Sequence, residues 1–137
     1  MLAKIFIVIG STIFGFLGFF HLFLTFKSNK FEARDKNVTL LMKCISPKIT
    51  SETSMWQAWV GFNASHSIGA MLIAAFYVPL AIFHMDVISG SWWFSSLGVI
   101  VGFSYLFLAK KYWFRTPFLG ILISTICFVV ACILVNS

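Results

Sequence analysis

Four long runs of apolar residues, separated by polar connections, dominate the pattern of the chain. A helix needs about 20 mostly apolar residues to cross the hydrocarbon layer of a membrane. The runs reach or approach that length, and they cover about residues 5–26, 55–83, 92–109 and 114–135. They predict an all-α fold, an integral membrane four-helix bundle, with residues 1–137 in a single transmembrane domain.

The polar connections predict how the helices are oriented. The long connection, residues 27–54, holds six of the ten basic residues, and the short connection around 110–115 holds three more. Only Lys4 lies elsewhere. Lysine and arginine are enriched in cytoplasmic loops. We therefore expect a cytoplasmic loop at 27–54 and both termini outside the membrane.

Composition narrows the class further. Hydrophobic residues make up 60% of the chain and charged residues 10%, whereas a soluble domain has about 25% charged residues. The net charge of +6 belongs to the connections, and no basic-aromatic pattern indicates a nucleic-acid partner. The three cysteines, Cys44, Cys127 and Cys132, form no C-x-x-C motif, so we expect free thiols.

Polar side chains gather at the start of the second apolar run. At about 100° per residue, Trp59, Asn63, His66 and Ser67 lie on one face of a helix. Polar and ionisable groups are costly inside a membrane and commonly mark a functional site. This face is therefore a candidate ligand-binding surface.

The other runs add polar groups at the same predicted depth. His21 and Thr25 lie near the cytoplasmic end of the first run, and Tyr105 lies in the third. At 1.5 Å per residue, His21 is about 8 Å and His66 about 15 Å from the cytoplasmic ends of their runs. We expect the two histidines to meet only if the second helix begins after Trp56. The candidate ligand-binding residues are His21, Thr25, Trp59, Asn63, His66, Ser67 and Tyr105.

Three interpretations of the two histidines remain open. They form a structural hydrogen-bonding pair, or they bind a lipid or quinone-like molecule, or they ligate haem in a membrane enzyme or redox protein. Two histidines are sufficient as axial haem ligands, whereas zinc requires more ligands than the spans supply, so we expect no other metal site. No nucleophile motif or carboxylate pair identifies a catalytic residue.

Two motifs carry a resemblance to a family. Gly18-x-x-His-x-x-x-Thr25 ends the first run, Phe31 and Arg34 follow, and Trp59-x-Gly-Phe-Asn-x-Ser-His-Ser-x-Gly69 lies in the second run. This pattern resembles a group of small bacterial four-span membrane proteins of unknown function. The resemblance implies a bacterial inner (plasma) membrane and supports grouping His21, Thr25, Asn63 and His66, but it implies no activity.

The sequence as a whole favours a small multi-pass membrane protein that acts as an accessory, assembly or oligomeric subunit. Short connections leave few polar surfaces, and small residues in the spans suit helix–helix association. The expected partners are membrane lipids and other membrane subunits or further copies of the chain, with a lipid or quinone-like ligand at the polar site.

Overall fold

The computed structural model describes all of residues 1–137. The chain is 82% helical and has no strands, which confirms the predicted all-α helical bundle. Four of its six helices are long and apolar enough to cross a membrane: α1 (Leu2–Lys27), α3 (Met55–Phe83), α5 (Trp92–Tyr112) and α6 (Arg115–Asn136). The two short helices are α2 (Lys36–Cys44) and α4 (Met85–Ser89).

Residue contacts group the chain into two compact units. The bundle unit comprises Met1–Leu17 and Ala70–Ser137, and the loop unit comprises Gly18–Gly69. Helices α1 and α3 contribute one part to each unit, whereas α5 and α6 lie wholly in the bundle unit and α2 in the loop unit.

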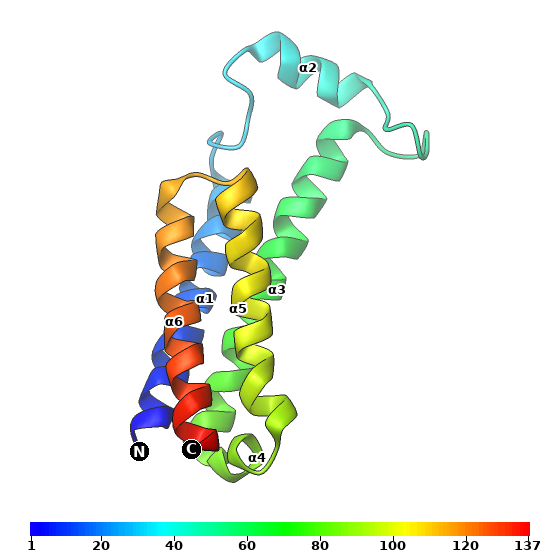
Figure 1. The fold of residues 1–137 in the computed structure, drawn as a ribbon. Helices are drawn as coiled ribbons and strands as arrows, with labels where there is room; N and C mark the ends of the chain where they lie inside the picture. Colours follow the sequence, from blue (N-terminus) through cyan, green and yellow to red (C-terminus); the bar gives the residue numbers. More distant parts are fainter. The chain divides into compact units, whose positions relative to one another are not determined.

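In the bundle unit, glycines bring α5 and α6 close together. The two helices are joined by a short turn and lie side by side (Figure 1). A Cβ atom at Gly98 would lie 2.8 Å from the ring of Phe128, and one at Gly102 would lie 2.8 Å from the hydroxyl of Thr125. Small residues at such positions allow membrane helices to pack at short range.

The first part of α1 packs in the same unit. Ser124 of α6 donates a hydrogen bond of 2.6 Å to the carbonyl of Gly10. Phe14 is fully buried and packs with Phe128 in the core of the unit. Ser11, which follows Gly10 directly and lies about one turn before Phe14, is also buried, and its hydroxyl has no hydrogen-bond partner.

In the loop unit, local hydrogen bonds set where the helices begin. Asp35 accepts from the backbone N–H of Asn37 at 2.8 Å and caps α2. Ser54 and Gln57 form a reciprocal capping box, in which each side chain accepts from the backbone N–H of the other. Helix α3 begins at Met55, directly after the capping residue Ser54.

Candidate functional site

The two candidate histidines meet in the loop unit. Their ring centroids are 5.4 Å apart, with the rings edge to face at 76°. The sequence predicted that the histidines would meet only if the second helix began after Trp56. That prediction was wrong, because the histidines meet although α3 begins at Met55. Counted from the helix ends, His66 lies five residues deeper than His21. Helix α3 therefore extends about 7 Å further than α1 at this end, at 1.5 Å per residue.

Asn63 fixes the orientation of the His21 ring. The amide nitrogen of Asn63 donates to the carbonyl of Trp59 at 2.8 Å, so its amide oxygen is the atom that faces His21. That oxygen lies 2.9 Å from Nε2 of His21. Because an amide oxygen only accepts, Nε2 carries the proton. In the neutral ring, Nδ1 of His21 then remains a hydrogen-bond acceptor.

Phe31 joins the histidines to the long connection. Its ring lies 4.5 Å from the ring of His21, and its carbonyl accepts a 3.1 Å hydrogen bond from the indole N–H of Trp59. Phe31 was not among the candidate ligand-binding residues. It is the only aromatic residue in the connection 27–54, and an isolated aromatic residue between polar neighbours was the signal that could have found it.

Two of the candidate hydroxyl groups are engaged within their own helices. Thr25 donates to the carbonyl of His21, and Ser67 donates to the carbonyl of Asn63, each at 2.8 Å. Their oxygen atoms remain acceptors, but their protons are donated to backbone carbonyls one turn earlier. Ser67 is fully buried. The two hydroxyl protons are therefore engaged within α1 and α3.

Tyr105 belongs to the bundle unit. Its ring packs edge to face against Phe14, with centroids 5.2 Å apart, and lies 6.2 Å from the ring of Trp113. Through these contacts the partly buried Tyr105 side chain packs against the core of that unit. The remaining six candidates, His21, Thr25, Trp59, Asn63, His66 and Ser67, all lie in the loop unit.

The geometry of the pair bears on the metal and haem interpretations. No three His, Cys, Asp or Glu side chains gather as a metal-binding group. Axial ligands face each other across a flat macrocycle, whereas His21 and His66 touch edge to face. To hold haem between them, the rings would have to separate and His21 would have to turn Nε2 away from Asn63 or ligate through Nδ1.

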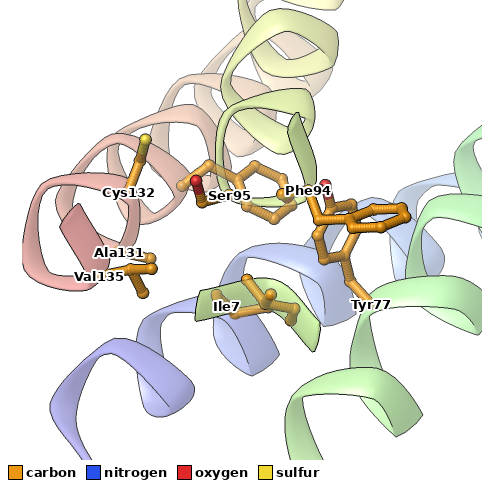
Figure 2. Close-up of a pocket in the computed structure, with 9 residues that line it drawn as sticks. Ile7, Tyr77, Phe94, Ser95, Ala131, Cys132 and Val135 are labelled. Atoms are coloured by element: carbon orange, nitrogen blue, oxygen red, sulfur yellow. Dashed lines mark hydrogen bonds between the residues drawn. The ribbon is translucent and has the colours of Figure 1, made fainter. Parts of the chain in front are cut away.

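A separate small pocket lies within the bundle unit. Figure 2 shows Ile7 of α1, Tyr77 of α3 and Val135 of α6 around it. Its polar groups are already bonded to the protein: Tyr77 donates to the carbonyl of Phe94 at 2.8 Å, and Ser95 donates to a carbonyl of its own helix. The pocket therefore offers mainly apolar contacts, and the paired histidines remain the candidate site.

Comparison of the chain with protein-family models, with curated proteins and with solved structures found no match. The fold nevertheless defines the class: the chain is a small multi-pass membrane protein with four apolar helices.

Proposed function

We propose that this protein binds a lipophilic molecule with a polar head, such as a quinone-like compound or a lipid, beside His21 and His66, and that it serves as an accessory or assembly subunit. The observation that carries the proposal is the pair itself. Two imidazoles from α1 and α3 lie 5.4 Å apart, and Asn63 orients one of them.

The chemistry of the pair suits such a head group. Nδ1 of neutral His21 accepts a hydrogen bond, while Nε2 is held by Asn63. His66 adds a second ring that contains one donor and one acceptor when neutral. The aromatic side chains of Phe31 and Trp59 lie at the same site and suit a planar ring.

Energetics favour a ligand over a purely structural role. Polar side-chain pairs in membrane proteins contribute on average only about 0.6 kcal/mol to stability. This stabilisation is small compared with the cost of placing two ionisable side chains in a membrane span, where such groups are commonly functional. A bound head group would supply a further hydrogen bond to Nδ1 of His21.

The accessory role and the location are supported by other features. Gly61 and Ser65 of α3 are exposed, and a Cβ at Gly61 would meet no atom within 4 Å, which leaves room for a helix of another chain. Basic residues in the loop unit support a cytoplasmic position for that unit and an outside position for both termini. The motif resemblance supports a bacterial inner membrane.

Native mass spectrometry of the gently purified full chain tests the ligand. We expect a stoichiometric small-molecule mass that is lost in His21→Ala and in His66→Ala. His84→Ala is the matched control, because His84 is an exposed histidine between α3 and α4, and it should retain the mass. Melting temperatures of the same samples separate loss of the ligand from loss of the fold.

Identical spectra for all four proteins would contradict the ligand proposal. An absorption spectrum of the same samples addresses the alternative directly. A Soret band that disappears in His66→Ala would replace the lipid or quinone-like ligand with haem and make the protein a haem or redox protein.

A further inference from the structure

Helix α2 is amphipathic and exposes its apolar side. At about 100° per residue, Val38, Leu41 and Ile45 form one stripe along the helix and its C-cap, and Lys36 lies opposite. The three stripe residues are 44%, 57% and 52% exposed. Such an exposed apolar surface indicates that a lipid bilayer or another molecule covers it.

The contacts of α2 within the loop unit are made by its polar side. Thr39 is buried and accepts a hydrogen bond from the backbone N–H of Ala33 at 3.2 Å. The ammonium group of Lys43 lies 5.3 Å from the ring centroid of Trp56, a cation–π distance. These contacts hold α2 in place while its apolar stripe stays uncovered.

We propose that the apolar stripe of α2 docks into the surface of a membrane that contains anionic lipids. The chain itself places α2 near a bilayer, because short segments join it to the ends of two helices able to span a membrane, at Lys27 and Met55. Interfacial helices typically combine an exposed apolar face with basic residues.

The charge of the surrounding connection complements anionic head groups. Residues 27–54 carry six basic and three acidic side chains. Lys48 is followed by Ile49, which is 91% exposed and adds an apolar side chain beyond the stripe. Each basic residue near an anionic surface strengthens attachment. An acidic protein would offer the same charge, but the bilayer is already the neighbour of the spans that flank α2.

Depth measurements on the full chain in nanodiscs test the docking. A fluorophore is attached through Ile45→Cys on the stripe or through Lys36→Cys on the opposite side, in a background with Cys44→Ser, Cys127→Ala and Cys132→Ala. With spin-labelled lipids in phosphatidylcholine–phosphatidylglycerol nanodiscs, we expect strong quenching at position 45 and weak quenching at position 36. Equal quenching at the two positions, or none, would overturn the proposal.

Charge variants test the part played by anionic lipid. In the Ile45→Cys protein, Lys48→Gln should lower the ratio of docked to undocked helix about fivefold in phosphatidylglycerol nanodiscs. Lys110→Gln, in the other basic connection, is the control and should change nothing. Docking that is insensitive to phosphatidylglycerol, or a label shielded from water without lipid quenching, would show a different occupant and overturn the proposal.

Discussion

The contact between α1 and α3 in the bundle unit predicts a strong effect from a single methyl group. A Cβ at Gly15 would lie 2.6 Å from the Cβ of Ala74, whereas carbon atoms pack best about 3.5–4.0 Å apart. Both atoms are fixed to helical backbone, so no side-chain rotation relieves the overlap. Gly15→Ala therefore forces the helices apart by about 1 Å, and overpacking of this kind costs about 1–3 kcal/mol.

Gly61→Ala is the matched control for contacts within one chain, measured on the monomer, because a methyl group there meets no atom within 4 Å. Both substitutions gain about 1 kcal/mol of helix propensity, so the difference between the two variants isolates the contact. Unfolding by sodium dodecyl sulfate in mixed micelles should show Gly15→Ala less stable than Gly61→Ala by about 1–3 kcal/mol. Adding Ala74→Gly to Gly15→Ala should recover part of the loss. Equal stability of the two single variants would refute the close contact.

Two further predictions concern other contacts and the topology. Ser124→Ala removes the hydrogen bond to the carbonyl of Gly10 and should lower the unfolding free energy by about 0.6 kcal/mol in the same assay; an unchanged value would show that the bond contributes nothing. Cys44 is exposed and Cys127 is buried, so a membrane-impermeant maleimide should label Cys44 in inside-out vesicles and leave Cys127 unlabelled. Labelling of Cys44 in intact cells would contradict the proposed cytoplasmic loop.

The helical class could be predicted from the sequence because hydropathy is a local property. Each apolar run carries enough transfer free energy to favour a helix in a membrane whatever its neighbours are. The start of α3 was also readable, since Ser54 and Gln57 have the spacing of a capping box. The predicted run 55–83 begins at the same residue as α3, so the later helix start on which the meeting of the histidines was predicted to depend does not occur.

The composition of the site could be predicted only in part, because it depends on the register between helices. Helical periodicity placed Asn63 and His66 on one face of α3. No local feature of the sequence, however, indicates how far α3 extends beyond α1. Phe31 illustrates the same limit. Its place against His21 depends on the path of the connection 27–54, whose sequence shows no helical or strand periodicity around Phe31. Tyr105 has the polar character of a site residue, yet long-range packing places its ring against the core of the bundle unit.

The polar side chains of the bundle unit contribute mainly to stability, whereas those of the loop unit include the candidate site. In the bundle unit, Tyr77, Ser124 and Thr125 bond to backbone carbonyls and so contribute to packing, with the buried Ser11 as the exception. In the loop unit, His21 retains an acceptor on Nδ1 beside a second imidazole. Substitutions in the bundle unit should therefore change unfolding more than ligand retention, and substitutions of the paired histidines should do the reverse.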